Sequence, residues 1–386
     1  MLFNDKERAS LDSKSYIEDD WDYLDRSGRV EAKRVPDFFN KWVSEYPDSD
    51  RAELIARITS GDNRHFQSAI FELVLYALLR SLGCSITVHP ELPNGSKTRP
   101  DFLIDTPQGE SIYLEAVIAS EYSEADVATR KRTSAVLNSI EKIESPNFFL
   151  GIKAEGNPER PPGSKFLRNE LKRWLGSLDP DAVAHDVSEN GHEAIPRKIW
   201  KLEDWIIEFE AIPIKPDRRG KGQRVIGLIS GGARFVNSWE PIRDAVKAKG
   251  NRYGVLPHPL LVAITVDALS LDRIDEMQGL FGQEGYIIDM NDTSAPPQMR
   301  RKANGAWFGE RGPQYTRVGG AWIFDGMNPW NIISRKNTLY FNPWAAMSLP
   351  EFFTTVQHAK VEGEQMQWRE GRSLRDILSL SIEWPA

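Results

Sequence analysis

The sequence predicts an α/β protein whose core runs helix, three strands, helix, strand. Apolar residues recur at helical spacing from Phe66 to Leu78, and Gly83 follows as a helix stop. Three runs with strand composition come next, at 85–89, 99–106 and 111–119. A polar helix is expected at about 124–144 and another strand at Phe148 to Lys153. This order predicts a single mixed sheet with helices packed against it.

The rest of the chain predicts an extension of this core. We divide the sequence into 1–60, an N-terminal helical segment; 61–155, the core; 156–295, an α/β extension that could continue the core sheet; and 296–386, a part rich in Trp, Gly and Pro. Within the extension, Trp205 to Ile212 and Val225 to Ile229 are expected to pair as strands around a basic loop. Helix Trp239 to Lys249 and the apolar strand Leu260 to Val266 follow, and polar segment 179–197 is expected to be a surface loop.

Composition excludes several classes of protein. The chain has 386 residues, 40% hydrophobic and 27% charged, which is enough apolar material for a sizeable core. Its longest apolar run, Leu260 to Val266, is far shorter than the ~18 residues of a membrane helix. One cysteine, Cys84, excludes an internal disulfide, and the charged N-terminal stretch is unlike a signal peptide, so we expect a cytoplasmic protein. The net charge of −7 argues against a wholly basic nucleic-acid binder but not against local basic patches.

The segment 99–119 predicts a β-hairpin that brings two carboxylates together. Pro107-Gln108-Gly109 suits a three-residue loop, because proline favours a type I turn and glycine takes the following left-handed position. This turn pairs Thr106 with Glu110, so counting outward places Asp101 opposite Glu115. Directly opposed residues share one face of the sheet, with Cβ atoms ~4.5–5.5 Å apart.

The alternating pattern of the same hairpin supports this register. The residues expected on the opposite face are all apolar: Phe102, Ile104, Leu114, Ala116 and Ile118. Two close carboxylates repel each other, and a divalent cation between them would remove that cost. Hard oxygen ligands suit Mg²⁺ or Mn²⁺, so Asp101 and Glu115 are candidate metal ligands, the alternative being two solvated strand residues.

These residues resemble the PD-(D/E)xK nuclease superfamily, whose restriction-endonuclease-like core is α-β-β-β-α-β. Pro100-Asp101 matches the first motif element, Glu115 the acidic member of the second, and Glu72 the acid often found on the first helix. The match covers roughly residues 62–155, and the segment Gly312 to Val318 also looks like bacterial proteins associated with this superfamily. The resemblance implies catalytic roles for Asp101, Glu115 and Glu72, with Mg²⁺ or Mn²⁺ as cofactor.

One position departs from the superfamily pattern. Val117 stands where the motif lysine is usual, and an aliphatic side chain cannot position water or stabilise developing charge. The superfamily tolerates a displaced lysine, so Lys153 on the next strand is expected to replace it, with Lys131 on the following helix as the second candidate. If neither reaches the carboxylates, the protein would bind nucleic acid or a protein without cutting. A further alternative is a scaffold subunit whose Trp-rich part docks a partner.

Clusters of basic residues beside aromatic ones are candidates for phosphate contact. The loop at 215–224 is the most suggestive, because its glycines allow its backbone to approach a phosphate. The candidate nucleic-acid-binding residues are Lys131, Lys215, Arg218, Arg219, Lys221, Arg224 and Arg317.

The sequence therefore predicts a metal-dependent endonuclease that hydrolyses DNA phosphodiester bonds, and the resemblance suggests restriction or defence against foreign DNA as its context. The expected partner is DNA, with a homodimer as one assembly to test and no membrane.

Overall fold

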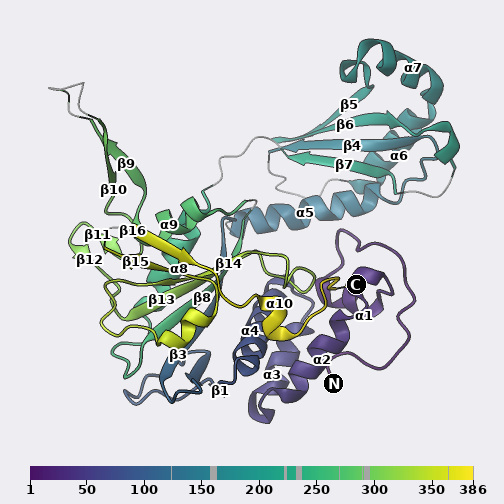
Figure 1. Ribbon diagram of the computed structural model, residues 1–386. Helices are drawn as coiled ribbons and strands as arrows, with labels where there is room; N and C mark the ends of the chain where they lie inside the picture. The colour runs from purple at the N-terminus through teal and green to yellow at the C-terminus, as the bar shows by residue number, and fades with distance from the viewer. Residues whose placement is uncertain are drawn as a thin grey trace. The chain divides into compact units, whose positions relative to one another are not determined.

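A computed structural model describes residues 1–122, 124–156, 163–220, 224–231, 237–268, 270–288, 290, 296–363 and 365–385 (Figure 1). The chain forms two compact units, each described by itself. Unit 1 consists of Met1–Asp12, Asp19–Glu121 and Val236–Ala386, and unit 2 of Ser13–Glu18 and Tyr122–Phe235.

Unit 1 is built on a large mixed sheet. In the described part of the chain its order is β1-β2-β3-β8-β13-β14-β15-β16. The strands β3, β8 and β13 run parallel to one another, whereas β1, β2 and β3 are successively antiparallel. The bounds are β1 Ser85–Val88, β2 Phe102–Asp105, β3 Ser111–Ser120, β8 Leu260–Asp267, β13 Val318–Asp325, β14 Asn337–Phe341, β15 His358–Glu362 and β16 Gln365–Arg369. The expected α/β class with a mixed sheet is confirmed.

Helices cover both faces of this sheet. On one face α4 packs against β1 and β3, and its apolar residues share a core with Phe102, Leu114 and Trp322. On the other face α8 packs against β3, β8 and β13 around Val262 and Ile264. The helices of unit 1 are α1 Asp20–Arg26, α2 Val35–Glu45, α3 Asp48–Ile58, α4 Asn63–Ser81, α8 Trp239–Gly250, α9 Arg273–Phe281 and α10 Leu374–Leu378, with short 3₁₀ turns η1 Val30–Ala32 and η4 Glu351–Thr355.

Short strands outside the main sheet complete unit 1. They are the antiparallel pair β9 Glu284–Ile287 and β10 Gln298–Arg301 and the pair β11 Phe308–Gly309 and β12 Gly312–Pro313. None of the helices in the described ranges is long and apolar enough to cross a membrane.

Unit 2 has its own sheet and its own core. The described strands lie in the order β5-β6-β4-β7, and helices α5, α6 and α7 belong to the same unit. Phe148, Leu150, Trp205 and Phe209 form its core with residues of α5 and α6. The bounds are α5 Glu124–Ile140, β4 Phe148–Glu155, α6 Ser164–Gly176, α7 Pro180–Asn190, η2 His192–Ala194, β5 Arg197–Leu202, β6 Trp205–Pro213, η3 Pro216–Arg218 and β7 Ile226–Gly231.

The strand beside β3 is β8, not the expected Phe148 to Lys153. The latter forms as β4 but pairs with β6 and β7 in unit 2. Burial explains the difference, because β8 is buried along seven consecutive residues and suits the centre of a sheet covered on both faces. By contrast, the last three residues of β4 are exposed or only half-buried. The sheet of unit 1 therefore combines strands from three of the four sequence ranges, and most of unit 2 lies between β3 and α8 in the chain.

Two further expectations were wrong. The segments 205–212 and 225–229 are strands, but each pairs with β4, which lies between them. The segment 179–197 contains α7 rather than only a loop. Its helix starts because the Asp179 side chain accepts hydrogen bonds from the Asp181 and Ala182 N–H groups, with Pro180 at the first helical position.

Candidate functional site

The hairpin forms in the expected register. Phe102 pairs with Leu114 and Asp105 with Ser111, so one further step outward places Asp101 opposite Glu115. The Thr106 N–H donates to the Glu110 carbonyl at 2.8 Å, closing the loop. Gly109 has φ of 85°, the left-handed conformation that the turn requires. Local turn chemistry therefore sets the position of both carboxylates.

Glu115 is a buried carboxylate held by groups from α8 and the residues after it. Its side chain is in the middle of β3, and the residue is 2% exposed. The Lys249 ammonium lies 2.5 Å from Oε1, and the Arg252 guanidinium lies 3.3 Å from the same atom. The Tyr253 hydroxyl donates to Oε2. These contacts offset the cost of burying an ionised carboxylate.

Asp101 is the less satisfied carboxylate of the pair. Its Oδ2 accepts a hydrogen bond from the Ala116 N–H at 2.6 Å. Burial, followed by the nearby negative charges of Glu115 and Glu72, raises the pKa of Asp101 to about 7, and Lys249 only partly offsets this. An acidic group with a raised pKa beside a second carboxylate is a candidate for proton transfer or cation binding.

Lys249 is the functional candidate that sequence reasoning missed. It lies in the last turn of α8, next to Gly250. A Cβ on Gly250 would lie 2.9 Å from Tyr315 Cδ1 and 3.0 Å from Val318 Cγ2, so glycine allows this end of the helix to approach β13 closely. Lys249 and Glu115 are 134 residues apart in the chain. The available signal was the basic and aromatic sequence KAKGNRY at the end of a predicted helix.

The two lysines expected from the sequence lie in the other unit. Lys153 is on β4 and forms an ion pair with Glu155 at 3.1 Å. Lys131 is on α5. Both belong to unit 2, whereas Asp101 and Glu115 belong to unit 1. Among the described residues of unit 1, the lysine that contacts Glu115 is Lys249.

Glu72 has structural partners. It is 3% exposed on α4, its Oε1 accepts a hydrogen bond from the Tyr46 hydroxyl at 2.6 Å, and its Oε2 lies 2.6 Å from the Arg57 guanidinium. Its charge contributes to the raised pKa of Asp101, but both of its oxygens hold α2, α3 and α4 together.

Two of the basic candidates of unit 2 are engaged in ion pairs. Arg219 makes a two-point contact with Asp181, at 3.2 and 2.8 Å. Arg224 pairs with Glu141 at 2.8 Å and lies over the Tyr16 ring. The remaining members are Lys131, Lys215 and Arg218 in unit 2, and Lys221, which lies outside the described residues.

Unit 1 has its own exposed cations near the carboxylate pair. Arg99 and Arg252 are 46% and 45% exposed, and each has one acidic partner: Arg99 pairs with Glu91 at 2.7 Å and Arg252 with Glu115 at 3.3 Å. Arg317, one of the residues expected to bind nucleic acid, is exposed and directly precedes Val318, which packs at Gly250. We call Arg99, Arg252 and Arg317 the basic rim.

The donor set is compatible with one hard cation. Among the described residues no group of three or more His, Cys, Asp or Glu side chains is arranged to hold a metal. Asp101 and Glu115 alone supply carboxylate oxygens. Mg²⁺ is commonly bound by one or two carboxylates, with waters and substrate phosphates completing its shell, so Asp101 and a Glu115 oxygen released by Lys249 or Tyr253 would be its protein ligands.

The raised pKa of Asp101 predicts a specific pH dependence of stability. Relative to the unfolded pKa of ~3.9, the folded state holds an extra proton between about pH 4 and 7, so stability falls as the pH rises through that window. We expect Asp101→Asn to be more stable than wild type above pH 7, by about 1–3 kcal/mol, and similar near pH 4. Urea unfolding at several pH values measures this.

The control is Asp105→Asn, on the exposed end of the same hairpin, which should keep the wild-type pH dependence. Equal pH dependence of wild type and Asp101→Asn would contradict the assignment.

Glu72→Ala should lower stability by about 2–3 kcal/mol. Loss of one partner leaves Arg57 and Tyr46 without their acceptor, although Arg57 keeps 27% of its surface in water and so loses less than a fully buried group. Urea unfolding measures the loss, and Glu53→Ala, whose side chain is 62% exposed beside the same arginine, is the control. An unchanged midpoint would show that the ion pair contributes little.

No family model, no curated protein and no solved structure matches this chain.

Proposed function

We propose that this protein is a metal-dependent nuclease whose site is formed by Asp101, Glu115 and Lys249. The observation that carries the proposal is the ion pair between Lys249 and Glu115, in which the ammonium lies 2.5 Å from Oε1. Glu115 is on β3, directly opposite Asp101. Two carboxylates and one lysine are the groups that the PD-(D/E)xK resemblance requires. Here the lysine comes from α8 instead of the position of Val117.

The order of elements in unit 1 supports the same proposal. Read without the inserted unit, the chain runs α4, β1, β2, β3, α8, β8, with β8 parallel to β3. This is the α-β-β-β-α-β order that the resemblance implies, with the last helix and strand taken from 239–267 instead of 124–153. Unit 2 then interrupts the core between its third strand and second helix.

Each residue of the site has a distinct proposed task. Asp101 and Glu115 would hold Mg²⁺ or Mn²⁺, which when bound lowers the pKa of water and stabilises charge on a phosphate. Lys249 would orient the attacking water and contact the developing negative charge. Arg252 and Tyr253 keep Glu115 in place, and the basic rim would contact the DNA backbone. Phosphodiester hydrolysis is the reaction these groups serve together.

The biological setting extends this proposal. The resemblance favours DNA as the substrate and restriction or defence as the context. The cytoplasm is the proposed location, because a chain with one cysteine forms no internal disulfide and suits a reducing compartment. A homodimer would place two such sites on the two strands of a duplex.

Lys249→Ala should lower Mg²⁺-dependent DNA cleavage by at least ~100-fold while DNA binding persists, because the ammonium that would contact the developing negative charge is lost. Asp101→Ala and Glu115→Ala should behave alike. Cleavage of a labelled duplex under single-turnover conditions measures the loss. Lys247→Ala, two residues earlier on the same helix, is the matched control and should cut as wild type does.

A rescue experiment sharpens this test. Adding Val117→Lys to Lys249→Ala returns a lysine to the usual motif position on β3 and should restore part of the activity. Cleavage by Lys249→Ala alone at the wild-type rate would contradict the proposed role of this lysine.

Metal binding has a readout that does not depend on activity. Mg²⁺ should raise the melting temperature of the wild type at pH 8, above the pKa of about 7 of Asp101, by binding only the folded state. Asp101→Asn should lose most of this shift, whereas Asp105→Asn should retain it. An equal shift in all three proteins would place the cation elsewhere.

A second candidate function is nucleic-acid binding without chemistry. The observation that favours it is that both oxygens of Glu115 already have partners, from Lys249, Arg252 and Tyr253. A protein of this kind would bind DNA with strong salt dependence and leave it intact with either Mg²⁺ or Mn²⁺.

A further inference from the structure

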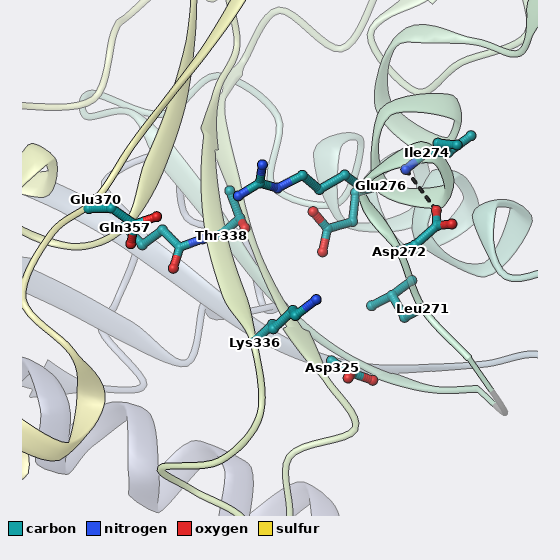
Figure 2. Close-up of a pocket in the computed structure, with 10 residues that line it drawn as sticks. Leu271, Asp272, Ile274, Glu276, Asp325, Lys336, Thr338, Gln357 and Glu370 are labelled. Atoms are coloured by element: carbon teal, nitrogen blue, oxygen red, sulfur yellow. Dashed lines mark hydrogen bonds between the residues drawn. The ribbon is translucent and has the colours of Figure 1, made fainter.

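Unit 1 contains a cavity at the opposite end of its parallel strands from Lys249. Asp325 ends β13, and Leu271, Asp272 and Arg273 follow β8 into α9; all four line the cavity (Figure 2). Lys249 instead lies by Gly250, which packs at Val318, the first residue of β13. The length of that strand, seven steps of ~3.3 Å, is about 23 Å. Ligands of α/β sheets commonly bind outside the carboxyl ends of parallel strands, which is where this cavity lies.

The cavity is large enough for an organic ligand. Its volume is about 620 Å³, which lies within the ~300–1,000 Å³ typical of small-molecule sites and exceeds what a single ion needs. The remaining lining residues are Ile274, Glu276, Lys336, Thr338, Gln357 and Glu370.

A fixed hydrogen-bond chain positions a buried carboxyl group at the cavity. The Trp368 Nε1–H donates to the Tyr340 hydroxyl at 3.4 Å, and this hydroxyl donates to Glu276 Oε2 at 2.5 Å. Glu276 is 5% exposed, and burial raises its pKa to about 7. The second oxygen, Oε1, has no hydrogen-bond partner among the described residues, so it can accept from, or when protonated donate to, a ligand.

Thr338 adds a second buried polar group. The residue is 2% exposed on β14, it lines the cavity, and its hydroxyl has no hydrogen-bond partner in the described part of the chain. This hydroxyl is therefore open to a hydrogen bond with a ligand or water in the cavity. Glu276 on α9 and Thr338 on β14 therefore both present polar groups to the cavity.

Two cations complete the site. Figure 2 shows the Lys336 side chain and the Glu276 carboxylate pointing toward each other across the cavity. Lys336 forms no ion pair with any described residue. Arg273 lies over the Trp368 ring, 5.3 Å from its centroid, and likewise has no carboxylate partner in the described ranges. Asp325, by contrast, is paired with Arg335 at 3.3 Å, so its charge is partly neutralised.

We propose that this cavity binds a nucleotide, with the phosphate on Lys336 and Arg273 and the base edge read by Glu276 and Thr338. A lone metal cation would be repelled by Lys336 and Arg273, which line the same cavity. A simple anion would meet the carboxyl groups of Asp272, Glu276, Asp325 and Glu370, which line the cavity together with the two cations. A planar heterocycle with donors and acceptors on its edge and a phosphate at one end matches the whole set. The ligand is either a free mononucleotide or a nucleotide turned out of a nucleic-acid strand.

This inference goes beyond the proposed nuclease activity and does not depend on it. Its test uses the full chain and isothermal titration with the four ribo- and four deoxyribonucleoside 5′-monophosphates, the matching nucleosides, inorganic phosphate and a mixture of amino acids. At least one nucleotide should bind, its nucleoside more weakly, and phosphate alone should not bind detectably.

Variants assign the binding to the cavity. Lys336→Ala should weaken nucleotide binding about tenfold or more, the factor expected for one charge-assisted hydrogen bond, with nucleoside binding unchanged. Thr338→Val should weaken both, and Glu276→Gln should change which base binds best. Lys33→Ala, an exposed lysine before α2, is the control and should bind as wild type does. Melting temperatures show that each variant is folded.

A second arm separates the two sources of the nucleotide. In Lys249→Ala protein, binding to a duplex with one unpaired nucleotide is compared with binding to the fully paired duplex. A preference for the unpaired site that Lys336→Ala removes identifies a nucleotide within a strand, and mononucleotide binding without that preference identifies a free ligand. The proposal is overturned if no nucleotide binds at ~1 mM in either arm, if amino acids bind instead, or if folded Lys336→Ala and Thr338→Val bind as tightly as wild type.

Discussion

The buried carboxylate of Glu115 is the constraint on which the site in unit 1 depends. An ionised group that is 2% exposed is tolerated only when charged and hydrogen-bonding partners surround it. Here those partners are Lys249, Arg252 and Tyr253, which reach β3 only because α8 packs across β3, β8 and β13. The packing of α8 on the sheet therefore also brings the partners of Glu115 into contact with its carboxyl group.

Asp101 shows what this arrangement leaves unsatisfied. The cations that neutralise Glu115 do little for the carboxylate opposite it, which has one backbone N–H as its hydrogen-bond donor. A buried acid with a raised pKa beside a second carboxyl group is typical of sites that perform proton transfer or bind a cation. Glu72, the third acid considered in the sequence, helps to raise the pKa of Asp101. Its own two oxygens are bound by the Tyr46 hydroxyl and the Arg57 guanidinium.

The two sites of unit 1 lie at opposite ends of the same parallel strands. Glu115, with Lys249, lies toward the start of β8 and β13, whereas Glu276 and Lys336 lie beyond their ends. Both contain a buried carboxyl with partners from a packed helix or strand. In the proposed reading, one end of the sheet carries the chemistry and the other end binds a nucleotide.

The sequence by itself determined the local features: helix α4 with its glycine stop, the hairpin register that sets Asp101 opposite Glu115, and the apolar strand β8. These depend on turn chemistry, periodicity and composition within some twenty residues. Only the tertiary structure decided that β8 instead of β4 lies beside β3, that Lys249 instead of Lys153 accompanies Glu115, and that Glu72 is bound to Arg57. Those outcomes depend on which strand can be buried on both faces and which side chains meet after packing, and contacts across 134 residues leave no periodic signal in the chain.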